Sequence, residues 1–236
     1  MAMTDTHLQI GALIFDGLDQ MDLTGPFEVL SRVPNSTYRI FGKTTTAVRD
    51  GRGLVLKPDA TLADAPPLDV LHVPGGTGQE GVMDDEDVLG WVRRQAQGAR
   101  IVFSVCTGAL ILGAAGLLKG RRATTHWNSF HLLPLYGAIP VNQRVVIDDK
   151  FVFASGVSSG IDGALRVAAL LRGDEAAQVI QLSMQYAPEP PFASGTLATA
   201  PEAVLAAARQ SMGEITEKRE QTARRVAQRL GIKAPA

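Results

Sequence analysis

The stretch Ser104-Val105-Cys106-Thr107-Gly108-Ala109 decides the fold, because it joins two different side-chain patterns. Residues 101–105 before the corner form a short apolar run, which is typical of a strand buried on both faces. Residues 107–112 favour a helix, and the small side chains of Gly108 and Ala109 leave room for a sharp turn against a sheet. The pattern therefore predicts a strand, a tight turn and a helix, with Cys106 at the corner.

The position of Cys106 favours a reactive thiol. A thiol at a helix N-terminus faces unpaired backbone donors and the positive end of the helix dipole, so we expect its pKa to be lowered. The backbone N–H groups of Thr107 and Gly108 are then candidates for stabilising negative charge beside the sulfur. The alternative is that Cys106 is only a small buried hydrophobic residue, as free cysteines often are.

Apolar runs elsewhere in the chain predict the rest of a sheet. Strands alternate with helices, which is typical of an α/β domain whose parallel sheet is covered on both faces. Residues 145–154 predict a hairpin, and residues 53–62 an extended edge segment. Further strands are expected at 8–15, 38–43 and 68–73, and helices at 84–99, 128–136, 158–171, 174–186 and 201–230.

The composition excludes several classes of protein. Of the 236 residues, 45% are hydrophobic and 20% are charged, which excludes a disordered chain. The formal net charge of −1 offers no general attraction to nucleic acid or to acidic membranes. The single cysteine excludes an intramolecular disulfide, and no spacing of histidines and cysteines indicates a metal site. Since the sequence also shows no signal peptide and no apolar run long enough to span a bilayer, we expect a cytoplasmic protein.

Asp22 is expected at the same sheet edge as Cys106. The first strand ends near Phe15, so the loop after it leads to the carboxyl ends of the strands, where ligands bind in α/β sheets. A carboxylate beside a thiol would have a raised pKa and could move a proton. The alternative is that Asp22 or Thr24 only caps the helix that contains Pro26. Asp19 is expected to lie in an exposed loop.

Gly75 and Gly76 follow a buried strand and can bring backbone close to the same edge. Their N–H groups are candidate oxyanion or substrate contacts. The next residues, 76–81, match the dinucleotide-binding pattern G-x-G-x-x-G. The four acidic residues at 84–87 would repel a pyrophosphate, and the strand at 101–105 does not end in the acid that would hold a ribose. We therefore expect no nicotinamide cofactor.

The histidines offer a weaker alternative for the chemistry. His126 follows a short apolar segment and could approach Cys106 as a general base. His72 lies within a buried strand, where a core histidine with satisfied hydrogen bonds is expected.

The segment 201–236 is expected to be a helical extension of an α/β domain at residues 1–200. It carries seven basic and four acidic side chains, interleaved so that pairs such as Glu214–Lys218 have helix-supporting spacing. This interleaving favours a solvated helix, or one that packs on a partner subunit, over a nucleic-acid-binding helix. Its apolar stripe consists of Val204, Leu205, Ala208 and Ile215.

Several motifs together resemble the ThiJ/PfpI superfamily, over residues 9–171. They are DLTGP at 22–26, VPGG at 73–76, SVCTG at 104–108, GLL at 116–118 and RATTHW at 122–127. Within the superfamily the chain is most similar to its isocyanide-hydrating members, including GAIP at 137–140 and YAP at 186–188. The resemblance implies a flavodoxin-like fold, a homodimer and a cofactor-free site. It implies that Cys106 is the nucleophile and that Asp22 stands where many relatives have a glutamate.

The activity implied by this resemblance is the addition of water to an isocyanide, which gives an N-formamide through a covalent thioimidate on Cys106. Asp22 would supply the proton. Thr107 stands where superfamily peptidases have histidine, which weakens a peptidase interpretation. Two alternatives remain: a glyoxalase- or deglycase-like enzyme, and the sensor domain of AraC-type regulators. The 36 residues after Ala200 are too few for the paired DNA-binding units of such a regulator.

Overall fold

The computed structural model describes residues 6–232 and is built on a seven-stranded sheet. The strand order is β10-β11-β7-β6-β1-β2-β5, and all neighbours are parallel except the β10–β11 hairpin. These strands are β1 (Leu8–Ile14), β2 (Ser36–Gly42), β5 (Ala60–Thr61), β6 (Val70–Val73), β7 (Ile101–Val105), β10 (Val145–Asp148) and β11 (Phe151–Ala154). The predicted parallel sheet and its hairpin are confirmed.

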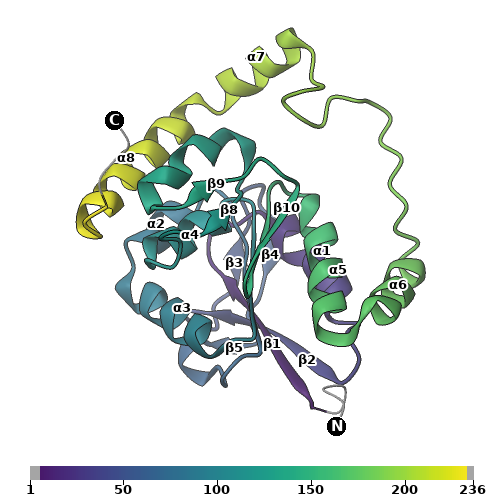
Figure 1. Cartoon of the computed structure of the whole chain (residues 1–236). Coiled ribbons are helices and arrows are strands. Elements are labelled where there is room, and N and C mark those ends of the chain that lie inside the picture. The colour runs from purple at the N-terminus through teal and green to yellow at the C-terminus, as the bar shows by residue number, and fades with distance from the viewer. Residues whose placement is uncertain (1–5, 233–236) are drawn as a thin grey trace.

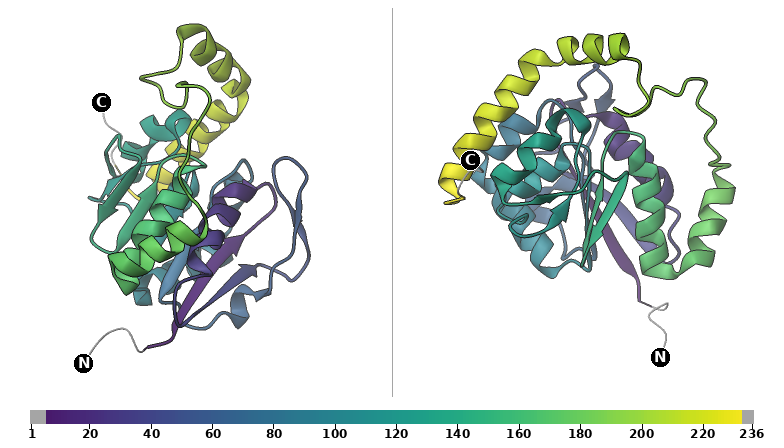
Figure 2. Two further views of the ribbon diagram at one scale, coloured as in Figure 1. Left: turned by 90° about the vertical axis from the view of Figure 1, so that its right-hand side faces the viewer. Right: turned by 45° about the horizontal axis from the view of Figure 1, so that its top comes forward.

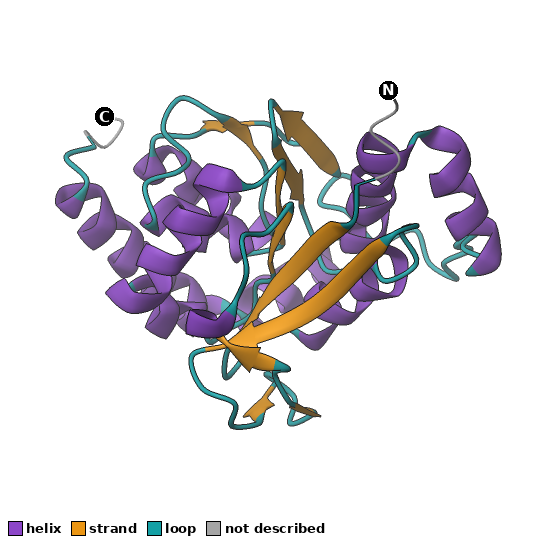
Figure 3. Cartoon of the chain, turned by 90° about the horizontal axis from the view of Figure 1, so that it is seen from below, coloured by secondary structure: helices purple, strands orange, loops and turns teal. Residues whose placement is uncertain are grey.

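Helices cover both faces of the sheet, as the flavodoxin-like expectation requires (Figure 1). One face carries α1 (Gln20–Leu30), α5 (Ser159–Arg172) and α6 (Asp174–Ser183). The other carries α2 (Gln79–Met83), α3 (Glu86–Gly98), α4 (Gly108–Ala114) and the 3₁₀ helix η2 (Trp127–Tyr136). Figure 3 shows these two helical layers on either side of the strands.

Short elements complete the chain between the main ones. The pairs β3 (Val48–Arg49) with β4 (Val55–Leu56), and β8 (Arg122–Ala123) with β9 (Ile139–Pro140), form two small sheets. The 3₁₀ turn η1 spans Leu62–Asp64. Among the described residues, no helix is long and apolar enough to cross a membrane.

Two apolar cores hold the layers together. Val102, Leu110 and Leu133 belong to the core beneath α4 and η2, whereas Val105 and Val167 belong to the core beneath α5. Burial of each such side chain contributes about 1.5–3 kcal/mol. Because both cores reach β7, the strand before Cys106 is buried on both faces and its end is rigidly placed.

The start of α1 differs from the sequence-based expectation. The helix begins at Gln20, and Asp19 caps it by accepting a hydrogen bond from the Met21 N–H at 3.0 Å. Asp19 is therefore the cap rather than a loop residue. Asp22 lies inside the helix and is fully buried, so the capping alternative for Asp22 is wrong. Pro26 lies in the second turn instead of the first.

The C-terminal segment also differs from the expectation. It divides at Met212 into α7 (Glu202–Ser211), which has no buried residue, and α8 (Gly213–Arg229). Figure 2 shows α8 lying along the outside of the α2 and η2 layer, while α7 and the preceding extended segment reach away from the domain. Helix α8 buries Arg219, Thr222, Ala223, Val226 and Ala227 against its own domain, so it is not a solvated helix.

Candidate active site

Cys106 occupies a sharp corner between β7 and α4. Its backbone has φ = 56°, in the left-handed region that is costly for a residue with a side chain. Two hydrogen bonds hold it there: its N–H donates to the Ala154 carbonyl at 2.9 Å, and its carbonyl accepts from Thr125 Oγ1 at 2.8 Å. The predicted strand, turn and helix are thus confirmed, and the surrounding backbone fixes the position of the thiol.

Glycine is required where the VPGG loop meets this corner. A Cβ atom on Gly75 would lie 2.5 Å from the Thr107 nitrogen, and one on Gly108 would lie 2.1 Å from the Val73 carbonyl oxygen. Both distances are far below van der Waals contact. The two backbones can therefore touch only because neither residue has a side chain.

Asp22 reaches the corner from α1. Its Oδ2 accepts a hydrogen bond from the Gly75 N–H at 3.0 Å, and the Cys106 thiol is close enough to interact with the carboxylate as a hydrogen-bond donor. Oδ1 is buried and has no conventional hydrogen-bond partner among the described residues. Burial raises the pKa of Asp22 to about 8, helped by the nearby Asp19 and opposed by Cys106, the Gly75 N–H and Arg219. The carboxyl group therefore holds its proton at neutral pH.

The thiol of Cys106 is held in its neutral form as well. Burial raises its pKa well above the ordinary value, and the neighbouring Asp22 raises it further. The Thr107 N–H and Arg219 act in the opposite direction. The expected lowering of this pKa is wrong, because removal from water and a buried acid outweigh the helix N-terminus. Cys106 and Asp22 together form a buried acid pair that retains both protons at pH 7.

The glycine N–H groups are occupied within the protein. That of Gly75 bonds to Asp22, and that of Gly76 donates to Thr107 Oγ1 at 3.0 Å. The structure thus places both glycines beside the predicted catalytic residues, where their N–H groups hold Asp22 and the Thr107 side chain. The Thr107 N–H faces the sulfur, as expected for an anion-stabilising donor.

Pro26 has a consequence for Asp22. As a proline it cannot donate the helical hydrogen bond to the Asp22 carbonyl, which lies close to the His72 ring. The Nε2 atom of His72 is buried without a hydrogen-bond partner among the described residues, so the expected histidine with satisfied hydrogen bonds is only partly confirmed. Nδ1 of His72 bonds to the Tyr38 hydroxyl at 2.7 Å, and burial lowers the pKa of His72 to about 3. His72 is a neutral core residue that supports the backbone carrying Asp22.

His126 is not placed as a partner of the thiol. Its Nδ1 accepts a hydrogen bond from the Asn128 N–H at 3.3 Å, as the cap of η2. Burial, with a contribution from Arg219, lowers the pKa of His126 to about 4. Its neighbour Thr125, rather than His126 itself, bonds to the Cys106 backbone.

Sequence reasoning missed Arg219 and Gln79. Both are buried beside the VPGG loop, and Arg219 belongs to the set of charged groups that act on Cys106 and Asp22. A signal was present, since Arg219 falls on the same helical stripe as Thr222, Ala223 and Val226. A cation on the buried stripe of a helix is expected to serve a specific site.

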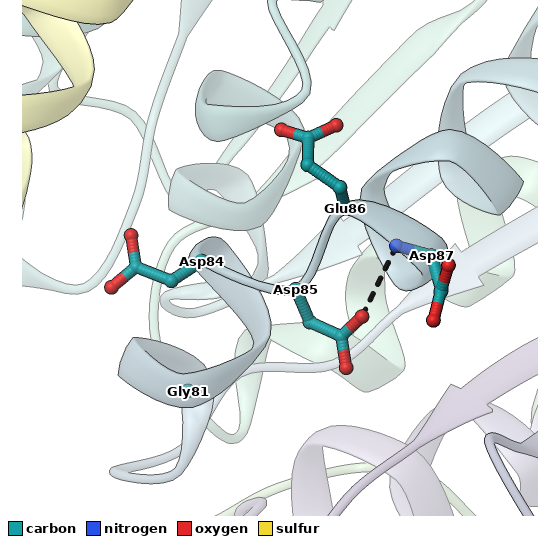
Figure 4. A pocket seen from close by; sticks show the side chains of 5 residues that line it. All are labelled: Gly81, Asp84, Asp85, Glu86 and Asp87. Atoms are coloured by element: carbon teal, nitrogen blue, oxygen red, sulfur yellow. Dashed lines mark hydrogen bonds between the residues drawn. The ribbon is translucent and has the colours of Figure 1, made fainter.

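The glycine loop that matches the dinucleotide pattern leads to an acidic depression. This cavity of about 380 Å³ is lined by Gly81 and by Asp84, Asp85, Glu86 and Asp87, whose carboxylates are shown in Figure 4. Asp85 caps α3 by accepting a hydrogen bond from the Asp87 N–H at 3.1 Å. The concentration of negative charge opposes pyrophosphate binding. In the part of the chain that the structure describes, no group of three or more histidine, cysteine or acidic side chains is arranged to hold a metal ion.

Comparison with known proteins places this site in a family. The chain is 47% identical to isonitrile hydratase of Pseudomonas putida over 226 residues, which cover 96% of this chain and 99% of that protein. The crystal structure of a ThiJ/PfpI family protein from Pseudomonas syringae superposes with a TM-score of 0.90 at 38% identity, covering 92% and 91% of the two chains. The transcriptional regulator GbdR of Pseudomonas aeruginosa is 28% identical over 185 residues, which cover 75% of this chain and 50% of the regulator.

The family model described as DJ-1/PfpI matches residues 9–170. These residues contain the sheet apart from Leu8, together with the Cys106 corner, Asp22 and the VPGG loop. The resemblance drawn from the motifs is confirmed, and the chain belongs to the DJ-1/PfpI family.

Proposed function

We propose that this protein is an isocyanide hydratase, a cofactor-independent enzyme that converts R–N≡C and water into R–NH–CHO. The observation that carries the proposal is the buried pair of Cys106 and Asp22, a nucleophile and a proton donor at one point. Its similarity over nearly the full length to isonitrile hydratase of Pseudomonas putida supports the same activity.

The first step forms a thioimidate. The sulfur of Cys106 bonds to the terminal carbon of the isocyanide while the carboxyl group of Asp22 gives its proton to that carbon. The thiol proton passes to the carboxylate, so the product is R–N=CH–S–Cys106 and Asp22 is again protonated. A carboxyl group with a pKa of about 8 suits this exchange, since it can donate and recover a proton near neutral pH.

The second step adds water. The water oxygen attacks the thioimidate carbon as Asp22 protonates the imine nitrogen and accepts a proton from the water. The intermediate R–NH–CH(OH)–S–Cys106 then releases the formamide, and the hydroxyl proton returns to sulfur through Asp22. Every atom of the isocyanide and of one water is found in the product, and the pair is restored.

Thr107, Gly108, Gly75 and Gly76 shape the site around this chemistry. The Thr107 N–H beside the sulfur would stabilise negative charge on it during bond formation and departure. Gly75 would orient Asp22 through the 3.0 Å hydrogen bond from its N–H. Gly108, with Gly75, would allow the close contact between the VPGG loop and the corner, and Gly76 would allow the loop to approach Leu18 and Asp19.

A homodimer is part of the proposal. Large apolar side chains on α6 and on the following extended segment face solvent, including Leu182 at 81% and Phe192 at 77% exposure. The extended segment and α7 reach away from the domain that precedes them (Figure 2). A second copy would cover these side chains, which are unusually exposed for a monomer.

The test is to incubate the purified protein with an aryl isocyanide and to detect the N-formamide by NMR. We expect turnover by the wild type and none by Cys106→Ala. Methylglyoxal and duplex DNA serve as the comparison ligands. Activity on methylglyoxal without isocyanide turnover would move the assignment to a glyoxalase-like enzyme, and salt-sensitive DNA binding without turnover would move it to a regulator.

A further inference from the structure

Arg219 is a buried cation without an acidic partner in direct contact. It is 6% exposed, and no described carboxylate forms an ion pair with its guanidinium. Removing a guanidinium from water is unfavourable unless negative charge or hydrogen bonds compensate it. Its position on α8 therefore needs an explanation beyond packing.

The hydrogen bonds of Arg219 lead to the corner of the active site. Nη2 donates to the Gly76 carbonyl at 3.4 Å, and Nη1 donates to Ser129 Oγ at 3.2 Å. Nε faces the Gln79 amide oxygen at 3.3 Å when that amide is oriented to satisfy its neighbours. The Gly76 peptide is itself bonded to the Thr107 side chain through its N–H and its carbonyl. A series of hydrogen bonds thus joins α8 to Thr107, the residue that follows Cys106.

The groups that face Arg219 are acids. Burial lowers the pKa of Arg219, and it is opposed by Cys106 from the corner, Glu80 from α2, Tyr136 from η2 and Asp22 from α1. Glu80 also accepts a hydrogen bond from the Thr222 hydroxyl of α8, which holds it to that helix. His126, which is neutral, also faces Arg219, and Asp19 acts on the neighbouring Asp22.

We propose that Arg219 is a positioning residue of the hydratase site, an inference that rests on the function proposed above. From α8 it orients the Gly76–Thr107 contact, and its positive charge balances the negative charge that develops on Cys106 and Asp22 during proton exchange. The C-terminal helix is then part of the catalytic site. Among the described residues, Arg219 is the cation that opposes the effect of burial on the pKa of both acids.

The experiment measures the pH dependence of iodoacetamide alkylation in Arg219→Gln, Arg219→Met and Arg219→Lys, each beside a thermal melt. Cys106 is the single cysteine of the chain, so alkylation reports it alone. We expect the pH midpoint of Cys106 alkylation to rise by about one pH unit or more in the Gln and Met variants. It should rise by less in the Lys variant, which keeps the positive charge. Turnover should fall at least about tenfold through kcat, with KM little changed.

Arg224→Gln is the matched control. Arg224 lies on the same helix, is exposed and pairs only with Glu220 among the described residues, so its loss should change neither midpoint nor turnover. The Met variant is a second replacement without charge, and the thermal melts show which of the two variants is folded at the assay temperature. Folded Gln or Met variants with the wild-type midpoint and kcat would overturn the proposal.

Two combinations of results distinguish failure of the proposed hydratase reaction from failure of the proposed role of Arg219. A wild type that does not hydrate isocyanides, together with a raised midpoint in Arg219→Gln, would reject the proposed reaction while retaining Arg219 as the residue that tunes the thiol. A wild type that hydrates isocyanides, together with an unchanged midpoint, would reject only the role of Arg219.

Discussion

The carboxyl group of Asp22, which is fully buried, lies beside the thiol of Cys106, which is 6% exposed. Asp22 lies on helix α1 and Cys106 lies at the β7–α4 corner. The Gly75 N–H donates a hydrogen bond to the Asp22 carboxylate and fixes its position beside the thiol. Burial raises the pKa of both groups, and Asp22 raises the pKa of Cys106 further, so both hold their protons at neutral pH. A stored proton is what an isocyanide carbon needs as sulfur attacks it.

The pKa of the Cys106 thiol should be higher than that of a free cysteine. Since burial and Asp22 raise the pKa of Cys106, the midpoint of iodoacetamide alkylation in the wild type should lie above about 8.5, the ordinary value for a cysteine. Alkylation rates between pH 6 and pH 11 measure it. In Asp22→Asn the midpoint should fall relative to the wild type, because the acidic neighbour is gone. A wild-type midpoint below that of a free thiol would show that the helix N-terminus dominates instead.

Stability should depend on pH through Asp22. The pKa of this carboxyl group is raised from 3.8 to about 8 by folding, so the folded state holds a proton that the unfolded state releases above about pH 4. The contribution of this proton to the free energy of unfolding is therefore complete below about pH 4 and is lost as the pH rises towards about 8. Asp22→Asn mimics the protonated acid, and we expect its Tm to exceed that of the wild type by a margin that grows from pH 5 to pH 8. A margin that shrinks over that range would contradict the raised pKa.

Gly75 should not accept a side chain. A Cβ atom at this position would lie 2.5 Å from the Thr107 nitrogen, so Gly75→Ala should force the VPGG loop away from the corner. We expect a loss of about 1–3 kcal/mol in the free energy of unfolding and a large loss of turnover. Gly81→Ala is the control, since nothing lies within 4 Å of its added Cβ. Chemical denaturation and formamide assays of both variants decide whether the close contact matters.

The protein should be a dimer in solution. Light scattering at micromolar concentration should give about twice the 25.1 kDa mass of one chain. Leu182→Glu places a charge among the exposed apolar side chains of α6 and should shift the mass towards the monomer. The mass of a single chain for the wild type would reject the dimer.

The sequence predicts the sheet and the corner well because both depend on local patterns. Buried strands show as apolar runs, and a strand that meets small residues at 108 and 109 predicts the turn at Cys106. The start of α1 could not be predicted from sequence, because the sequence favours Asp22 or Thr24 as the cap whereas the helix is capped by Asp19. The burial of Asp22 inside the helix depends on tertiary packing. Local patterns indicated which residue types meet at the site, but not how deeply they are buried.

The raised pKa of Cys106 and the burial of Arg219 could not be predicted from the sequence. The effect of a helix N-terminus on Cys106 can be predicted from sequence, whereas the opposing effects of burial and of Asp22 require coordinates. The interleaved charges of residues 201–236, which include Arg219, predict a solvated helix or one that packs on a partner subunit. The burial of Arg219 depends on α8 folding back over α2 and η2, a long-range contact that the sequence of the helix does not specify.

The most direct test of the proposed mechanism is the rate of N-formamide production from an aryl isocyanide by Asp22→Asn. Asparagine keeps an oxygen that can accept the Gly75 N–H, so the variant should fold, while losing most of the roughly 10²–10⁴-fold contribution of proton transfer. The wild-type rate should decline above about pH 8, where Asp22 loses its proton, and the residual rate of the variant should lack this decline. A folded Asp22→Asn protein that produces formamide at the wild-type rate would contradict the assigned role of the pair.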